Sequence, residues 1–224
     1  MDGPGLLQIP LDGVSKQKTA FVTARGLWEW EVLPMGLCNA PATFQRAMDG
    51  LLGGLKYVCV LVYLDDLLVY SPSWEQHLVD LRKVLERLKQ HRLYCKPKKC
   101  SFGDETTTHL GHTVSAEGLR PMTRHVDAIQ QFPRPTTKTQ LKSFLGLTGY
   151  YRTFVEGYAK HTAPLRRLCA NSVPADLRLL WDVACERSFE HLKSALTSAP
   201  ILAYPDWTKA FTLRTDASRD GLGA

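Results

Sequence analysis

The clearest pattern of apolar positions lies in residues 57–70, where an apolar run is interrupted once, by Asp65 and Asp66. Two short runs rich in β-branched residues, 57–63 and 67–70, predict buried strands joined by a tight turn. The two carboxylates then lie at the tip of the hairpin. Because burying an unpaired carboxylate costs several kcal/mol and adjacent like charges repel, the pair should be exposed, protonated or neutralised by a cation.

The pattern on either side of this hairpin predicts helices and short strands. Asn39 as N-cap and Pro41 in the first turn predict a helix over about 40–52, which ends at Gly53-Gly54. Ser73 caps a second helix over about 74–91, and its leucines at 78, 81, 85 and 88 predict a core face. Short strands are expected within 6–11, 19–23, 96–102 and 109–114, with a turn near Gly26.

The chain changes character after residue 116 and becomes mainly helical, with prolines as punctuation. Helices are expected at about 122–131, 137–156, 159–169 and 182–198, and a last strand at 210–215. The predicted fold class is therefore α+β, with antiparallel strands in the first half.

Composition is ordinary for a globular protein of 224 residues, with 44% hydrophobic and 22% charged positions. No apolar run reaches the length of a membrane span, and the first residues lack the features of a signal peptide. We expect a cytoplasmic or nuclear protein without a membrane partner, whose six cysteines are reduced.

The net charge of +6 is concentrated in residues 82–99, which hold eight basic residues against one acid, Glu86. Such a density of Lys and Arg suits a nucleic-acid phosphate backbone, although a solvated helix face is the commoner reason for a charge run. Magnesium suits the aspartate pair, since it prefers carboxylate and water oxygens and keeps positions open for phosphates. The alternative is that Asp65 and Asp66 are only polar turn residues.

The string Tyr63-Leu64-Asp65-Asp66, set between two strands, resembles the catalytic signature of reverse transcriptases, most closely those of Gypsy-type long-terminal-repeat retrotransposons. The resemblance implies that the pair joins an earlier aspartate to hold two magnesium or manganese ions. These ions would activate a primer 3′-hydroxyl and stabilise the leaving pyrophosphate. The implied partners are an RNA or DNA template-primer and deoxynucleoside triphosphates.

Other stretches resemble the same family in the same order. Residues 33–46 are similar to its second conserved block, by which Gly36, Pro41, Phe44 and Gln45 would shape the nucleotide pocket. Residues 96–102 and 109–114 resemble its last palm strands. That match implies Lys98 or Lys99 near the nucleotide phosphates and Leu110, Gly111 and His112 at the primer. Residues 144–152 look like the thumb, where Tyr150 and Tyr151 face either the nucleic acid or a core.

The resemblance also implies losses at both ends. The family's first catalytic aspartate would fall at Met1, so Asp2 is one residue out of register, and such a slip in a strand turns a side chain to the opposite face. Residues 199–224 resemble the start of a ribonuclease H domain, with Asp216 matching its first metal-binding carboxylate. The expected division is a palm without fingers at 1–115, a helical thumb and connection at 116–198, and a truncated ribonuclease H domain at 199–224.

Three functions are left open by these residues. The first is a fragment of an RNA-directed DNA polymerase from a retrotransposon polyprotein. The second is a catalytically dead relic that only binds nucleic acid. The third is an unrelated module, either a helical interaction module or a zinc module built from Cys95, Cys100, His109 and His112, although the spacing of these four departs from that of structural zinc sites.

Overall fold

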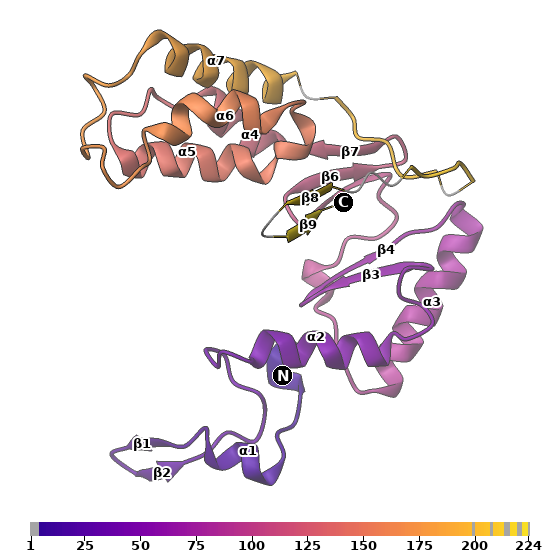
Figure 1. Ribbon diagram of the computed structural model, residues 1–224. Coiled ribbons are helices and arrows are strands. Elements are labelled where there is room, and N and C mark those ends of the chain that lie inside the picture. The colour runs from indigo at the N-terminus through magenta and orange to yellow at the C-terminus, as the bar shows by residue number, and fades with distance from the viewer. Residues whose placement is uncertain (1–4, 199, 207, 213–215, 219–220, 224) are drawn as a thin grey trace. The chain divides into compact units, whose positions relative to one another are not determined.

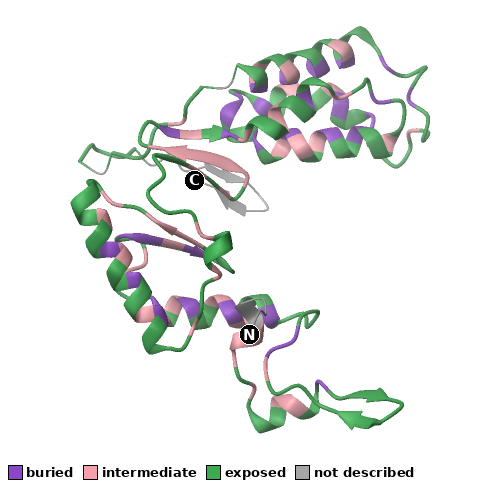
Figure 2. Cartoon of the chain, turned by 180° about the vertical axis from the view of Figure 1, so that it is seen from behind, coloured by how far each residue is buried: buried purple, intermediate pink, exposed green. Residues whose placement is uncertain are grey.

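The computed structural model describes residues 5–198, 200–206, 208–212, 216–218 and 221–223. The chain forms two compact units, Met1–Asp104 and Glu105–Ala224 (Figure 1). Both combine helices with antiparallel strands, which confirms the predicted α+β class. Buried positions gather on α2 (Ala40–Leu51) and β3 (Val60–Tyr63) in the first unit and on the helices of the second (Figure 2).

The first unit is built around a helix and a hairpin. Its elements in order are η1 (Gly5–Gln8), α1 (Gly13–Gln17), β1 (Phe21–Thr23), β2 (Gly26–Trp28), α2 (Ala40–Leu51), β3 (Val60–Tyr63), β4 (Asp66–Val69), α3 (Trp74–Gln90) and η2 (Pro97–Lys99). β1 pairs with β2 and β3 pairs with β4, both antiparallel.

Helix α2 is confirmed close to its predicted limits, and it supports the hairpin from one side. Its buried face, Phe44 and Met48, packs with Cys59, Val60 and Val62 of the hairpin region. Each fully buried side chain of this size contributes about 1.5–3 kcal/mol relative to exposure. The expected side-chain cap from Asn39 is absent, because that residue already has helical backbone angles and its side chain makes no capping bond.

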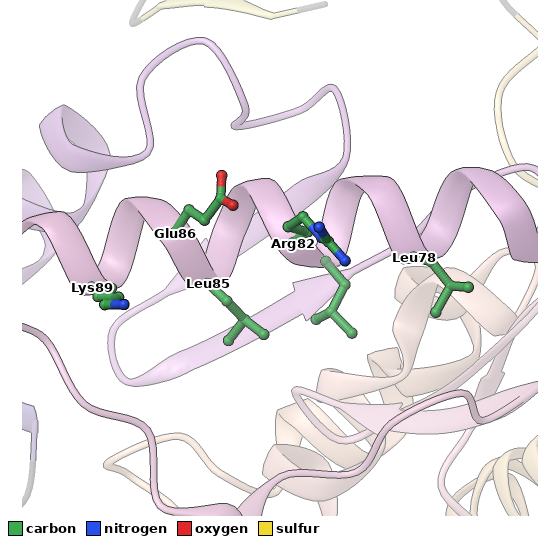
Figure 3. A pocket seen from close by; sticks show the side chains of 6 residues that line it. Leu78, Arg82, Leu85, Glu86 and Lys89 are labelled. Atoms are coloured by element: carbon green, nitrogen blue, oxygen red, sulfur yellow. The ribbon is translucent and has the colours of Figure 1, made fainter.

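Helix α3 begins as predicted, with the Ser73 hydroxyl accepting from the Gln76 amide at 3.2 Å. The predicted leucine core face is confirmed for Leu88 but is wrong for Leu78 and Leu85. The residues of α3 that the unit buries are Asp80, Val84 and Leu88, whereas Leu78 and Leu85 are 50% and 42% exposed. These two leucines line a shallow groove with Arg82, Glu86 and Lys89 (Figure 3). The spacing of leucines alone therefore identified only part of the buried side of the helix.

Several strand predictions are also corrected. The 96–102 segment is not a strand but contains the 3₁₀ turn η2, where Pro97 lacks an amide proton for a sheet. The first apolar stretch forms the 3₁₀ helix η1 instead of a strand. Residues 57–59 precede the hairpin as a turn, with Tyr57 at a φ of 64°. The predicted turn near Gly26 is confirmed between β1 and β2.

The second unit joins a three-stranded sheet to a helical bundle. Its elements are β5 (Thr106–His109), β6 (His112–Ser115), β7 (Gly118–Pro121), α4 (Thr123–Gln130), α5 (Lys138–Tyr150), η3 (Arg152–Phe154), α6 (Tyr158–Arg167), α7 (Val183–Thr197), β8 (Asp216–Ser218) and β9 (Gly221–Gly223). The order β5-β6-β7 is an antiparallel meander. The predicted strand 109–114 is therefore divided, since His109 ends β5, the chain turns back at residues 110 and 111, and residues 112–114 lie in β6.

The predicted helices of this unit are confirmed with adjusted ends. Helix α5 stops at Tyr150 and passes into η3, and α6 continues through Pro164. No strand forms at 210–212 of the predicted last strand, and residues 213–215 lie outside the described residues; β8 begins at Asp216.

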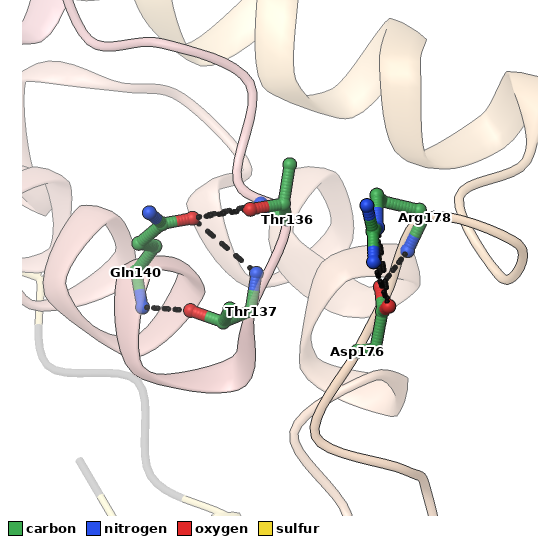
Figure 4. A network of polar contacts seen from close by, with 5 residues as sticks. All are labelled: Thr136, Thr137, Gln140, Asp176 and Arg178. Carbon is green, nitrogen blue, oxygen red and sulfur yellow. Dashed lines mark hydrogen bonds and ion pairs between the residues drawn. The ribbon is translucent and has the colours of Figure 1, made fainter.

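The start of α5 is fixed by a capping box. The Thr137 hydroxyl accepts from the Gln140 amide, and the Gln140 side-chain oxygen accepts from the Thr137 amide, each at 3.3 Å (Figure 4). The neighbouring Asp176 is bonded by the Arg178 guanidinium and amide, which lower the pKa of its carboxyl to about 2. Leu177, between these two residues, is fully buried and donates its amide to the Thr136 carbonyl at 2.9 Å.

Phe144 is the centre of the core of the second unit. It is fully buried, with ring centroids 4.6 Å from Phe189 and 5.3 Å from Phe132. We expect Phe144→Ala to lower the free energy of unfolding by about 3–5 kcal/mol, because it removes a buried ring and leaves a cavity. Urea unfolding of the 224-residue chain measures this effect. Leu179→Ala is the control, since Leu179 is 100% exposed, and equal effects of the two changes would contradict this assignment of the core.

Candidate active site

The candidate chemistry of the first unit lies at the turn between β3 and β4. Tyr63 pairs with Asp66, so Leu64 and Asp65 form a two-residue loop. Leu64 has a φ of 52°, and positive φ at the first loop position is the feature of a type II′ turn, which suits strand twist but normally favours glycine. Asp65 and Asp66 are both exposed at this turn, as the apolar pattern required.

Gln45 of α2 holds this turn in place. Its side-chain oxygen accepts from the Leu64 amide at 2.6 Å. Its side-chain nitrogen donates to the Val62 carbonyl at 3.3 Å and to a carboxylate oxygen of Asp49 at 2.9 Å. The oxygen and the nitrogen of the half-buried Gln45 side-chain amide are therefore both bonded, to the hairpin and to Asp49. The sequence nominated Gln45 but gave no sign of this contact, which joins residues 19 positions apart.

Lys56 completes the support from behind. Its ammonium lies 2.5 Å from the Asp49 carboxylate, and the Lys56 side chain is only 19% exposed. The bond from Lys56, followed by that from Gln45, lowers the pKa of the Asp49 carboxyl, and Asp49 in turn raises the pKa of Lys56. Lys56, Asp49 and Gln45 thus form a continuous chain of charge-assisted hydrogen bonds that ends at the aspartate turn.

The other candidate residues of this unit have different surroundings. Gly36 is exposed with a φ of 90°, and Pro41 is exposed in the first turn of α2. Phe44 is buried in the core, so it can affect a nucleotide pocket only through packing. Lys98 and Lys99 are exposed on η2.

Some basic residues of the segment 82–99 make contacts that stabilise the first unit itself. Lys83 pairs with the buried Asp80 at 3.0 Å, and Arg87 donates to the Leu51 carbonyl at 2.8 Å, near the C-terminal end of α2. The Asp80 carboxyl has a lowered pKa, first because of Lys83. These two cations stabilise the fold, which reduces the number that the sequence assigned to a phosphate backbone.

The candidate residues of the second unit lie together at the β5–β6 turn. Leu110 and Gly111 form its two-residue loop, and His112 opens β6. The hydroxyls of Tyr150 and Tyr151 donate to the carbonyls of Leu110 and Gly111. The two tyrosines, which the sequence left between nucleic acid and core, thus contact this turn.

Comparison with known proteins places this geometry in a family. Residues 5–114 match the family described as reverse transcriptase (RNA-dependent DNA polymerase). The chain belongs to the reverse transcriptase family. Residues 181–224 match the RNase H-like domain found in reverse transcriptase. The reverse transcriptase match includes the Asp65-Asp66 turn and the β5–β6 turn.

The relatives of this reverse transcriptase chain are retrotransposon polyproteins. It is 40% identical over 220 residues to the retrovirus-related Pol polyprotein from transposon 297 of Drosophila melanogaster, covering 98% of this chain and 20% of that protein. It is 33% identical over 209 residues to the transposon Tf2-3 polyprotein of Schizosaccharomyces pombe, covering 93% of this chain and 15% of that protein. The chain thus spans about a fifth or less of these curated relatives.

Solved structures of a viral reverse transcriptase have a fold similar to that of this chain. The foamy viral protease-reverse transcriptase in complex with double-stranded DNA matches with a TM-score of 0.81 and 28% identity, over 91% of this chain and 35% of that one. The complex of that enzyme with an RNA/DNA hybrid matches with a TM-score of 0.77 and 28% identity, over 90% of this chain and 27% of that one. The palm-and-thumb fold class is therefore confirmed.

The structure gives no side-chain surroundings for two candidate carboxylates, those of Asp2 and Asp216. Asp2 lies outside the described residues, as does the side chain of Asp216. In the described ranges, the proposed zinc ligands do not assemble, and no group of three or more His, Cys, Asp or Glu could hold a metal ion. None of the helices in the described ranges is long and apolar enough to cross a membrane.

The Asp49–Lys56 pair predicts a specific pH dependence. Because folding lowers the pKa of Asp49, its stabilising contribution is present above its unfolded pKa of about 4 and is lost as the pH falls through the folded value. The difference in unfolding free energy between the chain and Asp49→Asn should therefore shrink in strong acid and stay constant from about pH 5 to 8. Urea unfolding at several pH values measures it. In a Lys56→Met background the Asp49→Asn effect should become smaller, and an unchanged effect would contradict the pairing.

Proposed function

We propose that this chain carries the nucleotide-adding part of an RNA-directed DNA polymerase. The observation that supports the proposal is the exposed pair of aspartates on a turn fixed by Gln45, in a chain of the reverse transcriptase family. The proposed reaction joins a deoxynucleotide to a primer 3′-hydroxyl and releases pyrophosphate.

Asp65 and Asp66 are the proposed holders of magnesium or manganese. Within the described residues no basic side chain forms an ion pair with either carboxylate, and both are exposed, which fits a cation bound with water and phosphate oxygens. When bound, two such ions activate the attacking hydroxyl and stabilise the leaving oxygen. The protein's own part is to hold the two carboxylates in one geometry, which Gln45 supports by bonding Val62 of β3 and the loop residue Leu64.

The remaining residues have proposed supporting parts. Lys98 or Lys99 would attract the nucleotide phosphates, and Gly36, Pro41, Phe44 and Gln45 would shape the nucleotide site. Leu110, Gly111 and His112 would contact the primer, and Asp2 would be a further metal ligand. Asp216 would be a carboxylate of a nuclease site. We retain the division into a palm at 1–115, a thumb and connection at 116–198 and a ribonuclease H segment at 199–224 as part of this proposal.

The proposed partners are a template-primer and deoxynucleoside triphosphates. The foamy viral neighbours are complexes with double-stranded DNA and with an RNA/DNA hybrid, which supports a nucleic-acid duplex as ligand here. The net charge of +6 favours the same ligand, and binding should weaken with salt because phosphate contacts release counterions.

Primer extension on an RNA template tests the proposed activity. The 224-residue chain with magnesium should extend a DNA primer, and Asp65→Asn and Asp66→Asn should each lower the rate at least about a hundredfold, because each removes a carboxylate from the proposed metal site. Asp127→Asn, an exposed position on α4, is the control and should leave the rate unchanged.

The alternative function gives a different result in the same experiment. A relic would bind the template-primer in a salt-sensitive manner without extending it, and the aspartate variants would bind as the parent does. Extension that persists in both aspartate variants would exclude the proposed site.

Gln45→Met tests the support of the turn. The change removes three hydrogen bonds and leaves the Leu64 amide without its acceptor, so we expect the extension rate to fall about tenfold or more. Gln76→Met is the matched control, because it removes a similar amide bond to Asp80 at 2.8 Å in the same unit. Equal losses in the two variants, after correction for the folded fraction, would show that Gln45 has no special role.

A further inference from the structure

The β5–β6 turn has an unusual backbone for its sequence. Leu110 has a φ of 46° and Gly111 a φ of 71°, the two positive values of a type I′ hairpin turn. Glycine adopts this conformation freely, whereas in a leucine the Cβ atom comes too close to the following carbonyl oxygen. Contacts from outside the turn must therefore stabilise Leu110 in this state.

Two tyrosines at the end of α5 supply these contacts. The Tyr150 hydroxyl donates to the Leu110 carbonyl at 2.5 Å, and the Tyr151 hydroxyl donates to the Gly111 carbonyl at 2.6 Å. The His112 ring nitrogen Nδ1 also lies 2.8 Å from the Leu110 carbonyl. Both loop carbonyls are thus bonded by consecutive residues from a helix 40 positions away in the sequence.

The rings of the same residues pack against the turn. His112 lies 5.4 Å from Tyr150 and 5.5 Å from Tyr151 between ring centroids. A Cβ atom on Gly111 would meet the Tyr150 ring at 3.1 Å, so the absence of a side chain there permits the close approach. The turn and the end of α5 are therefore fitted to each other by shape as well as by hydrogen bonds.

The two tyrosines differ in their surroundings. Tyr151 is fully buried, its hydroxyl also lies 2.6 Å from Nδ1 of His125 on α4, and burial raises its pKa. Tyr150, by contrast, is 52% exposed. Tyr151 anchors the turn to the core, whereas Tyr150 fastens it at the surface.

We propose that Tyr150 and Tyr151 are positioning residues that fasten the Leu110-Gly111 turn to α5, so that the turn contacts a primer strand as one body with that helix. This inference rests on the proposed function, since it assigns the primer strand as the ligand of the turn. Without the two hydroxyls the turn would keep its sequence but lose its fixed position, and the primer end would be held less firmly.

Three single substitutions in the 224-residue chain test this proposal. Tyr150→Phe and Tyr151→Phe keep each ring and remove one hydroxyl. Tyr204→Phe is the matched control, because the Tyr204 hydroxyl donates to the Ser115 carbonyl at 2.9 Å, at the other end of β6. All three therefore delete the same kind of bond from the same hairpin, and Tyr150→Phe changes a half-exposed residue that the core does not require.

Hydrogen exchange of the backbone amides in residues 108–114 gives the first measurement. We expect about fivefold faster exchange in Tyr150→Phe and Tyr151→Phe than in Tyr204→Phe, the factor that corresponds to losing one hydrogen bond of roughly 1 kcal/mol. Equal exchange in the three variants would overturn the proposed fastening, whatever the activity of the chain.

Dissociation of a fluorescent template-primer gives the second measurement. The two turn variants should release the template-primer several-fold faster than Tyr204→Phe does, while release of the template strand without a primer should be unchanged. Equal release of the template-primer by all three would overturn the role in primer positioning, as would a parent chain that binds no template-primer. Failure of the parent chain to extend a primer would instead refute the polymerase activity, and the exchange and release rates would still decide the role of the tyrosines.

Discussion

A leucine with positive φ lies in each of the two hairpin turns that carry candidate chemistry, and a side chain from a helix stabilises each turn. Leu64 is bonded by Gln45 of α2, and the carbonyl of Leu110 is bonded by Tyr150 of α5. Since a leucine in this backbone region is unfavourable by about 1–2 kcal/mol, neither turn would be held by its own sequence. The geometry of both hairpins therefore depends on the position of a neighbouring helix.

The hydrophobic core of each unit holds the helix in question, α2 in the first unit and α5 in the second. In the first unit, Phe44 and Met48 hold α2 against the hairpin, so that Gln45, between them in sequence, projects toward the turn. In the second unit, Phe144 and Leu141 of α5 are fully buried, and the end of the helix is thereby presented to β5 and β6. Hydrophobic burial supplies most of the stabilisation, and the polar contacts select one conformation of each turn.

The basic residues of this chain have two kinds of surroundings. Lys56, Lys83 and Arg87 are taken up by structural bonds to Asp49, Asp80 and the Leu51 carbonyl. Lys98 and Lys99 are exposed on a 3₁₀ turn, where they are open to a phosphate ligand. A count of basic residues in the sequence cannot separate these groups, because the difference lies in which partner the fold brings within hydrogen-bond distance.

The sequence by itself determined the α+β class, the family, the aspartate hairpin and most helices, because these follow from local apolar periodicity, capping residues and short motifs. It failed where tertiary packing decides: α3 buries Asp80 and Val84 rather than Leu78 and Leu85, and residues 109–114 turn back because Leu110 is held in a left-handed conformation. The bonds from Gln45 and the two tyrosines were likewise decided only by the tertiary structure. Each joins residues far apart in the chain, and no local pattern specifies which distant side chain will reach a turn.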